Sequence, residues 1–321
     1  ILLMNRDRNY ITNFPLVSFV TPSFNTLKYI KDTISSIHNQ SYPNLQHIIM
    51  DGGSNDGTVE YVNSLKEIIF ISEKDKGQSN AINKAFDLCE GEIIGWLNSD
   101  DISNPGAIDY VVKYFDTHPE IEYIHSDVNI IDEEGQVTGR SIGEKLTLEK
   151  ILFKNPVKQP ALFMRKSLLK KLGRLREDLH FVMDMEFWLR IVVNNIKGAY
   201  ISDQVFANFR IMPGTKTVEA GPSFLNEWKQ VLTEYHINKS FSHKDLSLVT
   251  RAISHTTGAW YLGVMRDKRE VKGIVSIVKH FRKALFYNPT LWKNKGAWAF
   301  FLGRLLGLKI NRDGRFKKNE K

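Results

Sequence analysis

Short apolar segments alternate with amphipathic segments along the first 125 residues of the chain. The apolar segments have the composition of strands buried on both faces, and they span residues 17–21, 45–50, 67–71, 92–97 and 121–125. The segments between them have helical spacing, at about residues 26–38, 58–66, 78–88 and 105–115. This alternation predicts βαβ units, and therefore an α/β fold with a Rossmann-like, mostly parallel sheet.

The alternation weakens after residue 125. The later elements predicted from the pattern are strands at residues 159–165 and 205–211 and a helix at residues 184–194. Beyond Pro213 the pattern becomes helical, over residues 222–237, 246–265 and 269–286. We therefore expect an α/β domain over residues 1–217 and a helical C-terminal extension over residues 218–321.

The composition is that of an ordinary globular protein, with 321 residues of which 42% are hydrophobic and 25% charged. These values exclude disordered and fibrous classes. The single cysteine, Cys89, excludes an intrachain disulfide and a zinc site made of cysteines.

The net charge of +8 is unevenly placed along the chain. Residues 261–321 hold 16 Lys and Arg against 4 Asp and Glu, so the rest of the chain is net negative. A basic C-terminal region indicates an anionic partner, either a membrane or a nucleic acid. We expect no nucleic acid, because the sequence has no aromatic-basic recognition motif and the main body is not basic.

Residues 296–308 form an apolar segment with basic flanks. Thirteen residues are too few for a membrane-spanning helix, which needs about 20. We predict a basic amphipathic helix on a membrane surface. The expected location is the cytoplasm, either free or peripheral on the inner face of the plasma membrane. The alternative is a helix that packs on the protein itself or in a homodimer.

Polar clusters follow three of the predicted strands, at residues 21–25, 51–57 and 98–101. Ligands of open α/β sheets bind at the carboxyl ends of the strands, so these clusters are expected to converge on one crevice. The glycine-rich turn at 51–57 lacks the features of a phosphate-binding P-loop and of a dinucleotide fingerprint. It indicates either a different nucleotide site or only a tight turn with a helix cap.

Acidic residues mark two further places. Asp100 and Asp101 end a very apolar strand, where adjacent carboxylates suit Mg²⁺ or Mn²⁺ or, alternatively, cap a helix. Asp184 begins an apolar helix, where it is either a general base or simply stabilised by the helix dipole. The polar segment 73–83 is suited to contact a sugar or phosphate, or is a solvated loop.

Five segments occur in a characteristic order, namely PLVSFVTPSFN, IIMDGGSNDGTVE, ISEKDKGQSNAINKAF, GEIIGWLNSDD and DMEFWLRI. In these the chain resembles the family 2 glycosyltransferases over about residues 15–215. The resemblance implies an inverting enzyme with the GT-A fold. It also implies transfer from a nucleotide-diphospho-sugar, usually a UDP-sugar, to a hydroxyl of a glycan or lipid-linked acceptor in cell-surface polysaccharide biosynthesis.

The resemblance also implies roles for matching residues. Asp184 corresponds to the catalytic base, and Asp100 and Asp101 to the carboxylates of the metal site. One of these two is implied to contact the ribose and the other, which we expect to be Asp101, to bind Mn²⁺ or Mg²⁺. The residues implied in binding the donor are Thr21, Pro22, Ser23, Asn25, Asp51, Gly52, Ser54, Asp56, Gly77, Gln78, Asn80, Asn83, Ser99, Asp100, Arg210 and Lys216.

Two positions depart from the family pattern. Asn98 stands where the family often has a first aspartate, and Met212 where a histidine is common. These departures leave open a domain that binds a nucleotide-sugar without catalysis. A sugar-phosphate nucleotidyltransferase is the other alternative, although residues 21–25 contain neither the glycine nor the basic residue usual in its phosphate loop.

Overall fold

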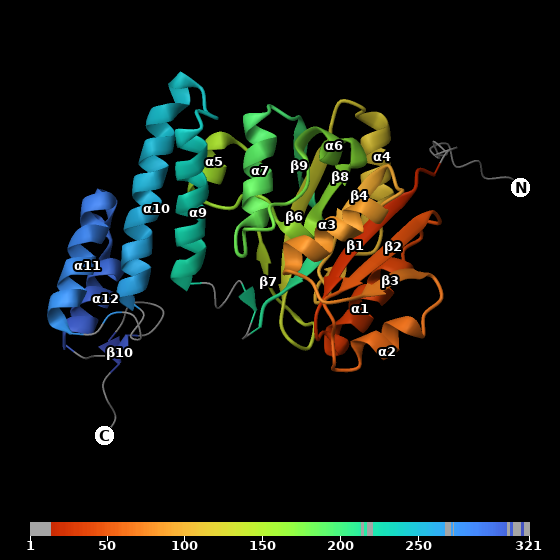
Figure 1. Ribbon diagram of the computed structural model, residues 1–321, viewed down its shortest axis with the longest axis horizontal. Coiled ribbons are helices and arrows are strands. Elements are labelled where there is room, and N and C mark those ends of the chain that lie inside the picture. The colour runs from red at the N-terminus through yellow and green to blue at the C-terminus, as the bar shows by residue number, and fades with distance from the viewer. Residues whose placement is uncertain are drawn as a thin grey trace, which may run out of the picture. The chain divides into compact units, whose positions relative to one another are not determined.

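The computed structural model describes residues 14–212, 215–216, 221–266, 271, 273–306, 309–310 and 316–317. The chain forms two compact units (Figure 1). The first contains Ile1–Thr147 and Asn155–Met212, and the second contains Leu148–Lys154 and Pro213–Lys321.

A nine-stranded sheet forms the centre of the first unit, in the order β3-β2-β1-β4-β8-β6-β9-β5, with β7 paired to β6. The strands are β1 Val17–Ser23, β2 Leu45–Asp51, β3 Ile68–Ser72, β4 Ile93–Trp96, β5 Ile102–Ser103, β6 Tyr123–Ile131, β7 Val137–Ser141, β8 Leu162–Arg165 and β9 Gly198–Arg210. Neighbouring strands are parallel from β3 to β4 and between β6 and β9. Strand β8 runs antiparallel between β4 and β6, and β5 and β7 pair antiparallel with β9 and β6. The long parallel pairings confirm the predicted α/β fold with a Rossmann-like, mostly parallel sheet.

Helices flank this sheet (Figure 1). They are α1 Leu27–His38, α2 Thr58–Asn63, α3 Gln78–Leu88, α4 Ala107–Thr117, α6 Lys166–Leu172 and α7 Met183–Val193. One core cluster joins Phe19 of β1 and Phe163 of β8 to Val111 and Phe115 of α4. A smaller cluster packs α1 and α2 on Ile49 of β2. Burial of these apolar faces fixes the helices on the sheet.

Several elements differ from the pattern-based expectation. The predicted strand at 121–125 is the start of the longer strand β6, and the one at 205–211 is the end of the 13-residue strand β9. Strands β5 and β7 and helix α6 were not predicted. Four of the five residues of β7 are exposed, so this strand has no apolar alternation by which a sequence pattern could reveal it.

The second unit is helical, as predicted for the C-terminal region. Its elements are α5 Leu148–Phe153, α9 Gly221–Ile237, α10 Leu246–Arg266, α11 Ile274–Tyr287, α12 Lys295–Leu306, β10 Lys309–Ile310 and β11 Phe316–Lys317. Its core contains Met265, Phe281, Ala284 and Ala297. No helix within the described ranges is both long and apolar enough to cross a membrane.

Helix α12 covers most of the segment predicted to lie on a membrane. Ala297 is buried, and the rings of Trp298 and Phe301 lie 4.9 and 4.1 Å from the ring of Phe281. These side chains pack on the protein's own body, which is the alternative left open by the sequence. Residues 307 and 308 of the segment lie outside the described residues.

Candidate active site

The loops that follow β1 and β2 are joined by hydrogen bonds. Asn25 has a positive φ of 53°, and its N–H donates to Ser54 Oγ at 2.7 Å. In return, its Oδ1 accepts from Asn55 N at 2.9 Å. Asp56 Oδ2 accepts from Leu27 N at 3.0 Å, at the start of α1. The predicted convergence of these two polar clusters is therefore present.

Asp51 shapes the glycine-rich turn from within. It is buried, and its Oδ2 accepts hydrogen bonds from Gly53 N at 3.0 Å, Ser54 N at 2.8 Å and Ser72 Oγ at 2.8 Å. Its Oδ1 accepts from Ser54 Oγ. Of the roughly four lone-pair positions of a carboxylate, these bonds leave one on Oδ1 unused.

The segment 21–25 presents few side chains to a ligand. Thr21, Pro22 and Ser23 are buried in β1. Thr21 Oγ1 lies 3.0 Å from Nε2 of His47, whose pKa is lowered to about 3 by burial. Ser23 Oγ lies 3.0 Å from Thr26 Oγ1. Asn25, by contrast, is exposed, so it is the accessible member of the predicted set in this segment.

The loop after β3 reaches the same place. A Cβ on Gly52 would lie 2.9 Å from Asp75 Oδ2, so only glycine fits there without displacing Asp75. Gly77 has a φ of 116°, and its N–H donates to Asp75 Oδ1 at 2.8 Å. The backbone conformation and the close approach explain the two glycines.

Two asparagines of α3 hold a loop that is distant in the sequence. Asn80 Nδ2 donates to Glu177 Oε2 at 2.9 Å, and Asn83 exchanges hydrogen bonds of 2.9 Å with the backbone of Leu175. Asn83 is also buried. These contacts give both asparagines a structural role in the segment before α7, and their predicted contact with the donor stays a prediction.

Asn98 is the centre of a polar network at the end of β4. Its Oδ1 accepts from Gln78 Nε2 at 3.0 Å and Trp96 Nε1 at 3.1 Å. Its Nδ2 donates to Gln159 Oε1 at 3.0 Å and Asp101 Oδ2 at 3.4 Å. An aspartate could accept the first two bonds but could not donate the others. The departure from the family pattern at position 98 therefore fits this structure.

Asp100 and Asp101 lie in different environments. Asp101 is fully buried, whereas Asp100 is half-buried and thus the more accessible of the two. Burial raises the pKa of both carboxyls, and repulsion from Asp100 raises the pKa of Asp101 further. A divalent cation would offset this cost, so the two carboxylates fit Mg²⁺ or Mn²⁺. The described residues contain no cluster of three or more His, Cys, Asp or Glu suited to a metal.

Arg210 donates hydrogen bonds to both of these aspartates. Its N–H donates to Asp101 Oδ1 at 3.0 Å, and its Nε to Asp100 O at 2.9 Å. Its Nη1 donates to the carbonyls of Asp132 and Glu133 at 2.9 and 2.8 Å, and the residue is only 1% exposed. The expected phosphate contact therefore has no accessible guanidinium donor in this conformation.

Asp184 begins α7 and is paired with Asn155, whose Nδ2 donates to Asp184 Oδ2 at 3.2 Å. Burial raises the pKa of Asp184 to about 6, against the lowering effect of hydrogen bonds from Met185 N and Asn155. A carboxylate with this pKa is mostly ionised at neutral pH and can still accept a proton efficiently.

The segment 155–161 links Asp184 to the end of β4. Asn155 contacts Asp184, and Gln159 contacts both Asn98 and the carbonyl of Trp96. The sequence analysis did not select Asn155 or Gln159. No spacing pattern connects them to residues so distant in sequence, and only the antiparallel insertion of β8 beside β4 brings this segment there.

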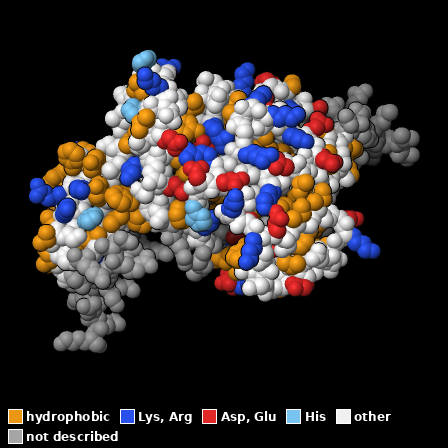
Figure 2. Space-filling view, in the orientation of Figure 1, with side chains coloured by type: hydrophobic (Ala, Val, Ile, Leu, Met, Phe, Trp, Pro, Cys, Tyr) orange, Lys and Arg blue, Asp and Glu red, His pale blue; other side chains and the backbone are white. Residues whose placement is uncertain are grey.

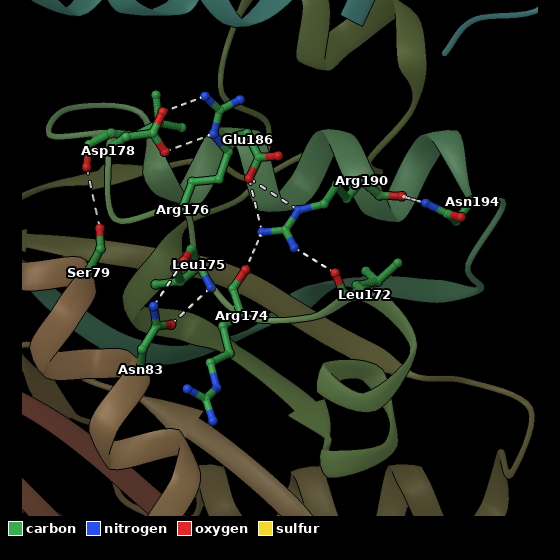
Figure 3. Close-up of polar contacts among 11 residues, drawn as sticks. Ser79, Asn83, Leu172, Arg174, Leu175, Arg176, Asp178, Glu186, Arg190 and Asn194 are labelled. Carbon is green, nitrogen blue, oxygen red and sulfur yellow. Dashed lines mark hydrogen bonds and ion pairs between the residues drawn. The ribbon is translucent and has the colours of Figure 1, made fainter. Parts of the chain in front are cut away.

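A second network holds α7 in place (Figure 3). Arg190 of α7 donates to Glu186 Oε2 at 3.1 Å and to the carbonyls of Leu172 and Arg174 at 2.7 and 2.8 Å. Asn83 of α3 holds the next residue, Leu175. These bonds tie the loop between α6 and α7 to helices α3 and α7, and they hold the helix that carries Asp184 in place.

Ser99 and Lys216 are the remaining residues that were predicted to bind the donor. Ser99 is buried beside Asp100. Lys216 is exposed and belongs to the second unit, as a residue beyond the boundary at Met212. Pro213, Gly214 and Thr217, which lie near Lys216 in the sequence, are outside the described residues.

Known structures share this fold. Staphylococcus aureus TarS 1-349 in complex with UDP-GlcNAc has a TM-score of 0.61 at 17% identity, covering 95% of this chain and 97% of that one. The mannosyltransferase PcManGT from Pyrobaculum calidifontis, in complex with GDP-Man and Mn²⁺, has a TM-score of 0.56 at 15% identity, covering 92% and 87%. The chain thus has the GT-A fold that the resemblance implied.

Sequence comparisons give the family. The profile of glycosyl transferase family 2 matches residues 18–173. An uncharacterised glycosyltransferase of Methanocaldococcus jannaschii is 32% identical over 200 residues, which is 59% of this chain and 69% of that protein. Chondroitin synthase of Escherichia coli is 35% identical over 127 residues, 38% of this chain but only 18% of that longer protein. The chain belongs to glycosyltransferase family 2 and is a transferase.

Proposed function

We propose that this protein is a metal-dependent, inverting glycosyltransferase that moves a sugar from a nucleotide-diphospho-sugar, most simply a UDP-sugar, to an acceptor hydroxyl. The observation that carries the proposal is one hydrogen-bonded site with two kinds of acid. The adjacent carboxyls of Asp100 and Asp101 suit a cation, and Asp184, with its pKa raised to about 6, suits a base. The segment 155–161 joins them.

The donor's nucleotide is proposed to bind over the interlocked loops after β1, β2 and β3. Asn25 is exposed there, and Gly52 brings backbone close to Asp75. Asp51 keeps one acceptor position for a base N–H while it shapes the turn. The fold neighbours bound to UDP-GlcNAc and GDP-Man support a nucleotide-sugar as the ligand class.

Asp100 and Asp101 are the residues that would hold Mg²⁺ or Mn²⁺. Such an ion, when bound, neutralises charge on the diphosphate leaving group. Asn98 and the N–H of Arg210 orient the Asp101 carboxylate through its two oxygens. Asp100 is proposed as the more direct ligand, because it is half-buried whereas Asp101 is enclosed.

Asp184 is proposed to take the proton of the acceptor hydroxyl. The oxygen then attacks the anomeric carbon from the side opposite the nucleoside diphosphate, a C–O bond forms, and the bond to the diphosphate breaks with inversion. Asn155 holds the carboxylate in one orientation during this step. Its hydrogen bond also favours the ionised form that a base requires.

The acceptor is proposed to be a growing cell-surface glycan or a lipid-linked precursor. The matched segment of chondroitin synthase supports a role in polysaccharide synthesis.

A panel of nucleotide-sugars, tested by calorimetry and by release of nucleoside diphosphate with Mn²⁺ or with EDTA, tests this proposal. Metal-dependent binding of one donor, followed by its slow hydrolysis, is expected. Pyrophosphate exchange with a sugar phosphate would instead indicate a nucleotidyltransferase. Donor binding without turnover, even with a range of acceptors, would indicate a non-catalytic domain.

Asp100→Ala provides the matched test of the metal role, with Asp101→Ala beside it. In Asp100→Ala, release of nucleoside diphosphate should be equally slow with Mn²⁺ and with EDTA. The melting temperature should stay close to that of the wild type, because Asp100 is partly exposed. Asp101→Ala should lower both the metal-dependent activity and the melting temperature, because it removes a buried partner of Asn98 and Arg210. Full metal dependence in Asp100→Ala would contradict the assignment.

A further inference from the structure

Helix α11 has two apolar stripes. Ile277, Phe281, Ala284 and Leu285 are buried in the core of the second unit. On another stripe, Ile274, Val275 and Phe286 are 63%, 83% and 77% exposed. A helix that packs against its neighbours with one face needs a single apolar stripe. The second, exposed stripe of α11 therefore indicates an interaction surface.

The exposed stripe forms an open groove of about 580 Å³. Its lining residues are Ile274, Val275, Val278, Lys279, Arg282, Lys283 and Phe286. They recur at intervals of one, three or four places, so they lie along one side of the helix. Figure 2 shows hydrophobic and Lys or Arg side chains together over the part of the molecule that α11 occupies in Figure 1.

The charge of this surface has one sign. Residues 273–306 contain six Lys and Arg and no Asp or Glu. Lys283 donates to the hydroxyl of Tyr261 at 3.2 Å and lies over its ring. Lys279 and Arg282 are exposed in the stripe itself, next to the apolar side chains. The stripe therefore combines apolar and cationic groups within one helix.

We propose that this stripe of α11 docks on the surface of a membrane containing anionic phospholipid. Ile274, Val275 and Phe286 would enter the boundary between headgroups and acyl chains, while Lys279 and Arg282 meet lipid phosphates. A second copy of the chain fits less well, because a two-fold contact would place these cations against the same cations of the other copy.

This surface differs from the segment that the sequence pattern favoured. In α12 the side chains of Trp298 and Phe301 are directed onto Phe281, so part of its apolar content is already used inside the unit. The docking of α11 does not depend on which sugar donor the first unit binds, and it is tested without any donor.

The test is co-sedimentation of the full chain with phosphatidylcholine vesicles, with and without phosphatidylglycerol. We expect binding only with phosphatidylglycerol, weakened by added salt. Replacing both cations in the variant Lys279→Glu/Arg282→Glu should lower affinity by about 25-fold or more, since each basic residue near anionic lipid contributes about five-fold. The variant Val275→Ser/Phe286→Ser should lower it by about ten-fold or more.

The matched control is Lys66→Glu/Lys113→Glu, which makes the same charge change at two exposed lysines of the first unit. It should bind vesicles like the wild type. All four replaced α11 residues are exposed, so the variants should keep the far-ultraviolet circular dichroism spectrum and melting temperature of the wild type.

Three results would overturn the proposal. They are no binding of the wild type to phosphatidylglycerol vesicles, equal loss of binding in the control, and unchanged binding in both α11 variants. Sedimentation equilibrium tests whether a second copy of the chain covers the stripe instead. A wild type that is a dimer and does not bind vesicles, together with a monomeric Val275→Ser/Phe286→Ser variant, would assign the stripe to contact between copies.

Discussion

Asp184 is the single residue whose surroundings best match a chemical task. Its half-buried position raises the pKa to about 6, and the amide of Asn155 limits that rise. Asn98 shows the complementary case, a neutral amide that both accepts and donates among four polar partners. Each residue leads to a prediction in which carboxylate and amide are exchanged, so that the chemistry of the side chain changes and its size does not.

Asp184→Asn keeps the size of the side chain and removes the base. Donor binding should be retained, while transfer should fall by about 10²–10⁴-fold, the usual contribution of a general base. The melting temperature at pH 8 should not fall, because the variant removes a carboxylate whose ionisation is opposed by burial. Transfer at the wild-type rate would rule out Asp184 as the base.

The pH dependence of the wild type follows from the same group. A base must be ionised, and the raised pKa of Asp184 lies near 6. The value of kcat/KM should therefore fall as the pH drops below about 6 and should level off above it. The measurement is initial rate against pH at low acceptor concentration, and a rate that stays constant down to pH 4 would contradict it.

Asn98→Asp should reduce stability. The new carboxylate cannot donate to Gln159 or Asp101, and it adds a third negative charge beside Asp100 and Asp101. Loss of buried hydrogen bonds typically costs about 1–3 kcal/mol, so the free energy of unfolding in urea should fall by about that much in the presence of EDTA. Asn129→Asp is a suitable control, because the side chain of Asn129 donates to an amide oxygen, that of Asn208, at 2.9 Å rather than to a carboxylate. An unchanged value for Asn98→Asp would show that the network is not needed.

At the scale of elements, the ends of strands are held by loops that come from elsewhere in the sequence. The aspartates after β4 are supported by Arg210 at the end of β9, and Asp184 by the segment 155–161. The loop before α7 is held by Asn83 of α3 and Arg190 of α7. Hydrogen bonds between elements, rather than the elements themselves, therefore set the geometry of the site.

Arg210→Ala tests whether that residue acts as a support or as a phosphate ligand. Removing a buried guanidinium leaves two backbone carbonyls and the carbonyl of Asp100 without a donor, so unfolding should require about 3 kcal/mol less. Thermal unfolding without ligand measures this. A variant with wild-type stability but a raised KM for the donor would instead support the phosphate contact.

At the scale of the whole molecule, the two compact units have separate cores. Aromatic residues of β1, β8 and α4 fill the first, and Phe281, Trp298 and Phe301 form part of the second. The short segment Leu148–Lys154 belongs to the second unit although it lies within the first in sequence. In that segment, Leu152 accepts a hydrogen bond from Trp228 of α9 at 3.4 Å, and Phe153 contacts His255 of α10.

Phe281→Ala should destabilise the second unit by about 3–5 kcal/mol, because it leaves a cavity beneath two aromatic rings. Limited proteolysis should then produce new cleavages within residues 221–306, while the first unit stays resistant. Phe286→Ala, which shortens an exposed side chain of the same helix, is the control and should behave like the wild type. Equal sensitivity of both variants would contradict the proposed core.

The sequence by itself determined the alternation of strands and helices, the family motifs and the position of the acidic residues, because these depend on local periodicity and on short segments. Only the tertiary structure decided which of the polar residues are accessible. Thr21, Asn83 and Arg210 look like ligand contacts in sequence, but their partners lie 26, 92 and 109 residues away. The same holds for Asn155 and Gln159, which no local pattern marks. Hydrogen bonding and burial depend on contacts across the sheet, and those contacts exist only once β8 and β9 have taken their places in it.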